Sequence, residues 1–168
     1  MSQYFNWNEF HFDPDNTFAA SWHYPAAGAA GYLALLYILS VVLKKEVASK
    51  STFMYIEVVH NLVLIVLSIF MGTGAIIGAF ERASNEGIGE LFCTTVSPDR
   101  IWDGKLGYFT YVFYLSKYYE LLDTVILSFR KKKIIPLQVW HHASMLFVTW
   151  SWFRFPWLEG SWWCTFGE

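Results

Sequence analysis

The segment KYYELLDTVILSFRKKKIIPLQVWHHASMLF, residues 117–147, decides the fold of this chain of 168 residues. It joins two apolar stretches, about 106–129 and 137–153, and each stretch carries charged or imidazole side chains among its apolar residues. A charged side chain that faces hydrocarbon costs roughly 2.5 to 3.5 kcal/mol on membrane-insertion scales. The segment therefore predicts two neighbouring membrane helices whose polar faces turn toward protein or water and away from lipid.

The composition of the whole chain also indicates that lipid is its solvent. Hydrophobic residues make up 55% of it and charged residues 15%, whereas about a quarter of a soluble domain is charged. Two further apolar stretches, about 26–43 and 53–80, are long enough at ~1.5 Å per residue to cross most of a ~30 Å hydrocarbon core. We predict an all-α fold, a polytopic membrane helix bundle of about four spans. The net charge of −2 gives no reason to expect a nucleic-acid partner.

The charges between the spans predict the topology. Residues 1–25 are predicted to form a lumenal N-terminal segment and residues 26–168 one membrane domain, with the glycine-containing stretch 81–105 as an extramembrane loop. The first twenty residues lack Lys, Arg and an apolar run, which argues against a cleaved secretory signal. The positive-inside rule places the more basic span ends in the cytosol. Those ends hold Lys44, Lys45, Lys50 and the tract 130–133, and the opposite ends hold Arg82, Arg100, Lys105 and Arg154.

The two cysteines, Cys93 and Cys164, are too few for a disulfide scaffold and lack the spacing of a zinc motif. The predicted topology puts both on the oxidising side of the membrane. One disulfide between them is therefore compatible with the sequence.

The third predicted span carries one polar face. Lys117, Glu120 and Asp123 recur at i, i+3 and i+6 and so fall within an arc of about 120° on a helix. Three charges on one face indicate a cavity lined by protein or water. The alternative is an internal ion pair between Lys117 and Glu120 that only orients helices and leaves Asp123 without a partner.

The fourth predicted span carries a matching face made of Gln138, His141 and His142. Asp123 lies seven residues before Arg130 and His141 five residues after Pro136, so both are about 7 to 11 Å inside the same boundary. If the two helices are antiparallel neighbours, the acid and the imidazoles lie at one level. The alternative is a pair of buried histidines satisfied by backbone or water.

Imidazole groups in such a place can bind a metal, transfer protons or attack an acyl group. The chain has five histidines and only two share the predicted site. This number disfavours a metal centre, although carboxylates could complete a mononuclear site in a fragment of a metal oxidase. Acyl or proton chemistry fits better, and we expect neither a resident metal nor a cofactor.

A basic tract lies between the two polar spans, made of Arg130, Lys131, Lys132 and Lys133. Four like charges at the end of a span are usually a topology signal. They can also attract a polyanionic head group, such as the phosphates of coenzyme A, whose apolar tail would then enter the bundle.

These residues together resemble the motifs of the fatty-acid elongase (ELO) family. Lys117-Tyr-Tyr-Glu-Leu-Leu-Asp-Thr124 with the basic tract after it resembles the family's KxxELLDT motif, and Gln138-Val-Trp-His-His-Ala143 resembles its HxxHH box. His60-Asn61 and the stretch 150–152 fit the same pattern, and the resemblance covers about residues 25–165. It implies that these four spans are the N-terminal part of a fold of seven spans around an acyl tunnel.

The sequence departs from the family pattern in two places. Gln138 stands where the commonest box has His, which resembles elongases of lower eukaryotes and algae that act on polyunsaturated chains. Gly160-Ser-Trp-Trp163 resembles the run that leads into the family's NxxxHxxMYxYY motif, but the sequence stops at Glu168, before that motif and before a lysine-rich retrieval signal.

The resemblance implies the condensing step of fatty-acid elongation in the endoplasmic reticulum membrane. Acyl-CoA and malonyl-CoA would give 3-oxoacyl-CoA, carbon dioxide and coenzyme A, with membrane lipid, other enzymes of the elongation cycle or a second copy of the chain as partners. His141 would accept the acyl group or act as base, His142 and Gln138 would orient it, and the charged face of the third span would keep the opposite wall polar. The alternative is an inert, truncated paralogue that binds a full-length elongase.

Overall fold

The computed structural model describes residues 6–43, 50–91 and 102–155. All regular elements in these ranges are helices, and no strand occurs in them, which confirms the predicted all-α fold. The elements are α1 (His23–Val42), α2 (Lys50–Glu86), the short 3-10 helix η2 (Ile88–Leu91), α3 (Gly104–Glu120), α4 (Leu122–Phe129) and α5 (Pro136–Arg154).

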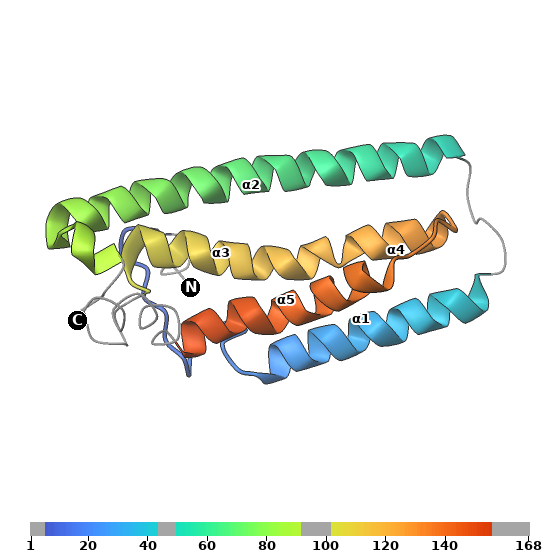
Figure 1. Ribbon diagram of the computed structural model, residues 1–168, viewed down its shortest axis with the longest axis horizontal. Helices are drawn as coiled ribbons and strands as arrows, with labels where there is room; N and C mark the ends of the chain where they lie inside the picture. The colour runs from blue at the N-terminus through green and yellow to red at the C-terminus, as the bar shows by residue number, and fades with distance from the viewer. Residues whose placement is uncertain (1–5, 44–49, 92–101, 156–168) are drawn as a thin grey trace.

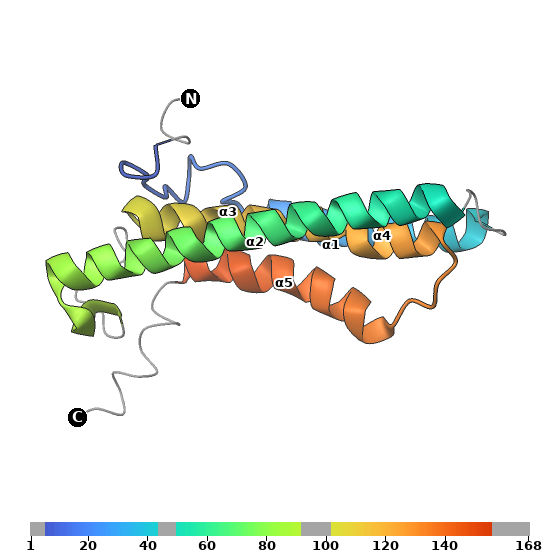
Figure 2. The same cartoon turned by 90° about the horizontal axis from the view of Figure 1, so that it is seen from above.

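The long helices run side by side along the longest axis of the molecule (Figure 1). Helix α2 packs against α3, and α5 packs against both α1 and α3. The end of α1, the start of α2, the end of α4 and the start of α5 all lie at one end of the bundle, at the right of Figures 1 and 2. Successive spans therefore alternate in direction, as the predicted topology requires; which end faces the cytosol stays a prediction.

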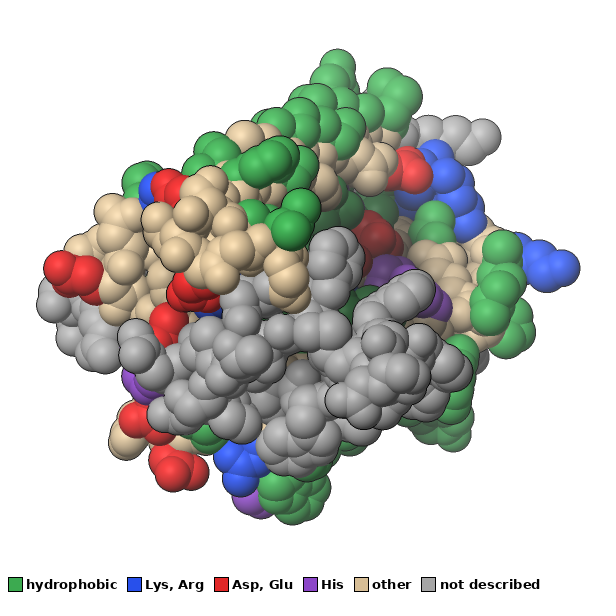
Figure 3. All heavy atoms as spheres, turned by 60° about the vertical axis from the view of Figure 1, so that its left-hand side comes forward, with side chains coloured by type: hydrophobic (Ala, Val, Ile, Leu, Met, Phe, Trp, Pro, Cys, Tyr) green, Lys and Arg blue, Asp and Glu red, His purple; other side chains and the backbone are tan. Residues whose placement is uncertain are grey.

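Two of the described helices are long and apolar enough to cross a membrane, namely His23–Val42 and the stretch Phe53–Glu86 of α2. Large apolar side chains such as Tyr37, Val66 and Phe80 are exposed on them. Figure 3 shows hydrophobic side chains gathered on the outer surface, while some acidic and histidine side chains lie recessed between the helices. An apolar exterior around polar interior groups is what lipid as a solvent requires.

Helix α2 is longer than the sequence predicted. The predicted loop from residue 81 starts instead as helix, which continues to Glu86 and contains an Arg82–Glu86 ion pair at 3.6 Å. Gly87 follows the last helical residue; its φ of 102° suits glycine, and its N–H donates to the Ala83 carbonyl at 3.0 Å. Residues 92–101 of that loop, which include Cys93 and Arg100, lie outside the described residues, as do Lys44, Lys45 and Cys164. The predicted loop also contains the short helix η2, and its last two residues already belong to α3.

Two glycines let α2 approach α3 closely. A Cβ atom on Gly78 would lie 2.5 Å from the backbone nitrogen of Leu106, and one on Gly74 would fall into the ring of Phe109. Gly74 and Gly78 are four residues apart, the spacing by which membrane helices bring their backbones together. This contact fixes α3 along α2 and so fixes the position of the polar face further along the chain.

The N-terminal segment, residues 6–22, is docked on the far ends of α3 and α5. Phe10 and Phe12 pack in one buried aromatic cluster with Tyr111, Tyr114 and Phe153. The Tyr111 and Tyr114 hydroxyls donate to the backbone carbonyls of Phe18 and Ala19, and Trp150 Nε1 donates to that of Ala20. This segment therefore closes one end of the bundle.

Candidate functional site

The third predicted span is two helices, α3 and α4, that meet at Leu121. Leu121 keeps helical dihedral angles (φ −58°, ψ −25°), so α4 continues the direction of α3 (Figure 1). Lys117 Nζ lies 2.7 Å from Glu120 Oε1 and 4.1 Å from the centre of the Phe113 ring. The internal ion pair that the sequence left as an alternative is therefore present.

Asp123 nevertheless has partners, because its carboxylate lies between two imidazoles from different helices. Its Oδ1 atom is 2.5 Å from Nε2 of His60 on α2, and its Oδ2 atom is 3.8 Å from Nε2 of His142 on α5. His60 is only 5% exposed. The structure thus brings an acid and an imidazole of the two polar spans to one level.

Gln138 contacts the same helix as Asp123 through a buried hydroxyl. Thr124 is fully buried, and its Oγ1 accepts hydrogen bonds from the Tyr32 hydroxyl at 2.9 Å and from Gln138 Nε2 at 3.4 Å. These bonds connect α1, α4 and α5. Gln138 therefore holds α5 in register beside the Asp123 carboxylate.

Replacing Thr124 by Val is expected to lower the free energy of unfolding by about 1 kcal/mol, because the buried Tyr32 hydroxyl then loses its acceptor. Tyr32→Phe removes that hydroxyl, so the double variant is expected to lose less than the sum of the two single losses. Equilibrium unfolding in mixed micelles measures all three values. Strict additivity would show that this hydrogen bond contributes nothing.

His141 is placed differently from the other candidates. Its side chain is exposed, and its ring centre lies 5.9 Å from that of His142 at an interplanar angle of 66°. Among the described residues, the structure does not bring His141 into hydrogen-bond contact with the charged face of α3 and α4. Any role for His141 thus depends on what approaches the open face of α5.

The basic tract is largely engaged within the protein. Arg130 Nη1 donates to the Glu57 carboxylate on α2, and Lys132 Nζ lies 3.3 Å from the same carboxylate. Lys131 Nζ donates to the Leu43 carbonyl at the end of α1. Lys133 is exposed. The tract therefore ties the ends of three helices together, and among the described residues Lys133 is its member without an ion pair or side-chain hydrogen bond.

Two residues of this arrangement, His60 and Glu57, were not predicted as site residues, although His60 with Asn61 fits the family pattern. A usable signal for His60 existed. It lies seven residues after Phe53, where the predicted span begins, just as Asp123 lies seven residues before Arg130. At the helical rise of ~1.5 Å per residue, His60 and Asp123 both lie about 10 Å from the same membrane boundary.

The candidate residues do not form a metal set. Within residues 6–43, 50–91 and 102–155, no group of three or more His, Cys, Asp and Glu side chains is arranged to hold a metal ion. The carboxylate of Asp123 is instead directed at the two imidazoles themselves.

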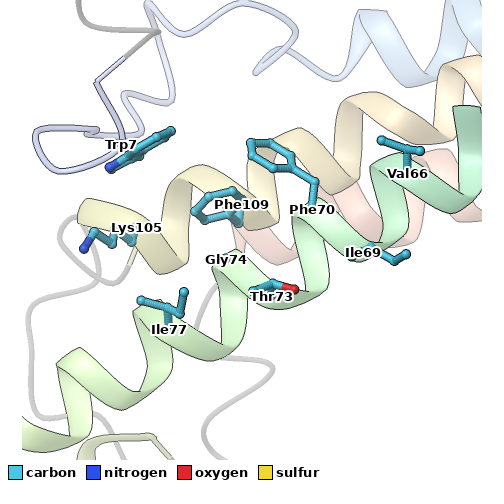
Figure 4. A pocket seen from close by; sticks show the side chains of 9 residues that line it. All are labelled: Trp7, Val66, Ile69, Phe70, Thr73, Gly74, Ile77, Lys105 and Phe109. Atoms are coloured by element: carbon cyan, nitrogen blue, oxygen red, sulfur yellow. The ribbon is translucent and has the colours of Figure 1, made fainter.

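Two of the cavities further along the bundle are lined mainly by apolar side chains. One, of about 350 Å³, is lined by apolar and small side chains of α2, α3 and α5, including the stacked rings of Phe113 and Trp152. Its α2 residues, 68–75, begin eight residues after His60, or about 12 Å along the helix. The other, of about 590 Å³, lies between α2, α3 and Trp7 and contains none of the candidate site residues (Figure 4).

Comparison with known proteins gives a consistent result. The family described as "ELO: GNS1/SUR4 family" matches residues 17–167. Fatty acid elongase sre1 of Dictyostelium discoideum is 36% identical over 156 residues, which are 93% of this chain and 57% of that protein. Fatty acid elongase A of the same organism is 35% identical over 130 residues, 76% of this chain and 45% of that protein.

A more distant relative is fatty acid elongase 2 of Trypanosoma brucei brucei, 27% identical over 139 residues, which are 77% of this chain and 51% of that protein. The chain thus spans about half the length of these curated relatives. No solved structure matches it.

Proposed function

Since this chain belongs to the GNS1/SUR4 (ELO) family, we propose that it takes part in the condensing step of fatty-acid elongation. In that step acyl-CoA and malonyl-CoA give 3-oxoacyl-CoA, carbon dioxide and coenzyme A. The observation that carries the proposal is the Asp123 carboxylate, which faces His60 on α2 and His142 on α5. A carboxylate beside an imidazole supports acyl transfer because it orients the ring and stabilises its protonated form.

In the proposed reaction the exposed His141 is the nucleophile. One of its ring nitrogens attacks the thioester carbon of acyl-CoA, a C–N bond forms, the C–S bond breaks and coenzyme A leaves. Malonyl-CoA then loses carbon dioxide, and its α carbon attacks the acyl carbon, which forms the new C–C bond and frees the imidazole. His142, held by Asp123, is the neighbouring group available to carry a proton during these steps.

The cavity between α2, α3 and α5 supports an acyl substrate. Its lining residues are mostly apolar or small, and it begins about 12 Å along α2 from His60. A chain that enters from the reacting end would pass the imidazoles and then lie against the rings of Phe113 and Trp152. Gln138 would contribute to the choice between saturated and polyunsaturated chains through its contact with Thr124.

The basic tract is proposed to attract the phosphates of coenzyme A. Lys133 is exposed, whereas Arg130 and Lys132 are paired with Glu57. An anionic head group would meet Lys133 first and would compete with Glu57 for the other two cations. This proposal places the tract on the cytosolic face of the endoplasmic reticulum membrane, in a multi-pass arrangement.

A second candidate function is that of a non-catalytic partner of a longer elongase. It is favoured by the exposure of the His141 side chain. A partner that packs against the open face of α5 would enclose that ring. Other enzymes of the elongation cycle or a second copy of this chain could take the same place.

The test is expression of this chain in an elongase-deficient host, followed by gas chromatography of total fatty acids. We expect acyl products lengthened by two carbons, and we expect His141→Ala to reduce them by roughly 100-fold or more, because the acyl acceptor is lost. His23→Ala, which changes an exposed histidine at the opposite end of the bundle, should leave them unchanged.

A chain that accumulates in the membrane and makes no lengthened products would contradict the catalytic proposal. Co-expression with a full-length elongase then tests the second candidate, which expects a change in the yield or chain length of that enzyme's products.

A further inference from the structure

His60 is the most enclosed of the groups around Asp123, and the reaction proposed above does not use it. It lies on α2 in a stretch whose other residues are mostly apolar and exposed, yet its own side chain is buried. Its ring is 4.8 Å from that of Tyr119 at an interplanar angle of 38°, which limits its rotation. A buried imidazole in an apolar helix is costly unless its polar atoms are paired, so its partner is informative.

That partner is one oxygen of a carboxylate whose other oxygen faces the reacting helix. Oδ1 of Asp123 is 2.5 Å from His60 Nε2, and Oδ2 is 3.8 Å from His142 Nε2. An ionised carboxylate only accepts hydrogen bonds, so the nitrogen of His60 donates. Because a carboxylate is planar, holding one oxygen also fixes the direction of the other.

The other polar groups nearby are already engaged. Lys117 pairs with Glu120, and Gln138 pairs with Thr124. The packing of α5 is mainly against α1 and α3, so the Asp123 carboxylate is the polar connection between α2 and His142. Without His60, rotation about the Asp123 side chain would be free to carry Oδ2 away from α5.

We propose that His60 is a positioning residue, which holds the Asp123 carboxylate so that Oδ2 stays directed at Nε2 of His142. A carboxylate in that place favours the His142 tautomer with the proton on Nε2 and the lone pair on Nδ1. The importance of this for acyl transfer rests on the proposed function. The positioning of the Asp123 carboxylate by His60 does not depend on that function.

The test uses the full chain in lipid nanodiscs with ¹⁵N-labelled histidine. Side-chain ¹⁵N shifts give the tautomer of His142, which is assigned with His142→Gln. His60→Phe keeps a ring against Tyr119 and removes the donor, and we expect it to change the ratio of the two His142 tautomers by roughly fivefold. His60→Gln restores a donor and should recover most of the original ratio.

The matched control is His11→Gln, which removes a separate His–Asp pair, His11 with Asp103, at the opposite end of the bundle. It should leave the His142 spectrum unchanged. If His60→Phe fails to fold by circular dichroism, Asp123→Asn decides instead. It keeps the shape of the side chain and should shift the signals of His60 and His142 together.

An unchanged His142 tautomer ratio in folded His60→Phe would overturn the proposal, and so would a shift of only one histidine in Asp123→Asn. Neither measurement needs turnover. A failure here therefore leaves the condensing reaction open, and a catalytically inactive chain leaves this result valid.

Discussion

The substitution Gly78→Ala is expected to lower the free energy of unfolding by about 2 kcal/mol. The added Cβ would lie 2.5 Å from the nitrogen and 2.9 Å from the Cα of Leu106. Both are backbone atoms that cannot rotate away, so α3 must move off α2, and overpacking of this kind costs about 1–3 kcal/mol. Equilibrium unfolding in mixed micelles measures the loss.

Gly72→Ala, on the same helix, is the matched control, because a Cβ atom added at Gly72 would meet nothing within 4 Å. There the change removes only the conformational penalty of glycine and should stabilise the protein by about 0.5–1 kcal/mol. Equal effects at the two positions would show that the close approach of α2 and α3 is not what Gly78 provides.

Removal of the Asp123 carboxylate is expected to reduce elongation strongly. Asp123→Ala takes away the hydrogen-bond acceptor of His60 and the negative charge that faces His142. Misplaced general acid–base groups lower rates by factors of about 10²–10⁴, so we expect a loss of about 100-fold or more in two-carbon products in the elongase-deficient host. The protein level in the membrane is measured in parallel, since a buried imidazole without its partner also destabilises the bundle.

Asp123→Asn separates the two effects. The amide oxygen can still accept from His60, so the fold is retained, but the negative charge beside His142 is gone. A loss of product similar to that of the alanine variant, at normal protein level, is the expected result. Full activity of Asp123→Asn would show that the charge plays no part in the reaction.

The sequence predicted the helices better than their contacts. Four apolar stretches predicted four helical regions because hydrophobic length alone is informative in lipid. The predicted end of α2, at residue 80, was wrong. The polar sequence Glu81–Glu86 is typical of a loop, but the Arg82–Glu86 ion pair and Gly87 allow about a further turn and a half of helix. The interruption at Leu121 left no signal in the sequence.

The candidate site was predictable only where its members share a helix face. Helical spacing along the sequence relates Lys117, Glu120 and Asp123 to one another, and it also relates Gln138 to His142. The partner of Asp123 on α2 is 63 residues away, and only the count of residues from a membrane boundary relates the two. The pairing of Glu57 with the basic tract was missed for the same reason.

The docking of the N-terminal segment sets an order of events during synthesis. The carbonyls of Phe18 and Ala19 are bonded by residues 93 and 95 positions later, and that of Ala20 by one 130 positions later. The ribosome makes these acceptors first, but the donors on α3 emerge only after α1 and α2 have been translated, and the donor on α5 only after α4 as well. The N-terminal segment is therefore synthesised first but docks last. A tag or crosslink that holds this segment away from α3 and α5 should delay folding of the whole protein.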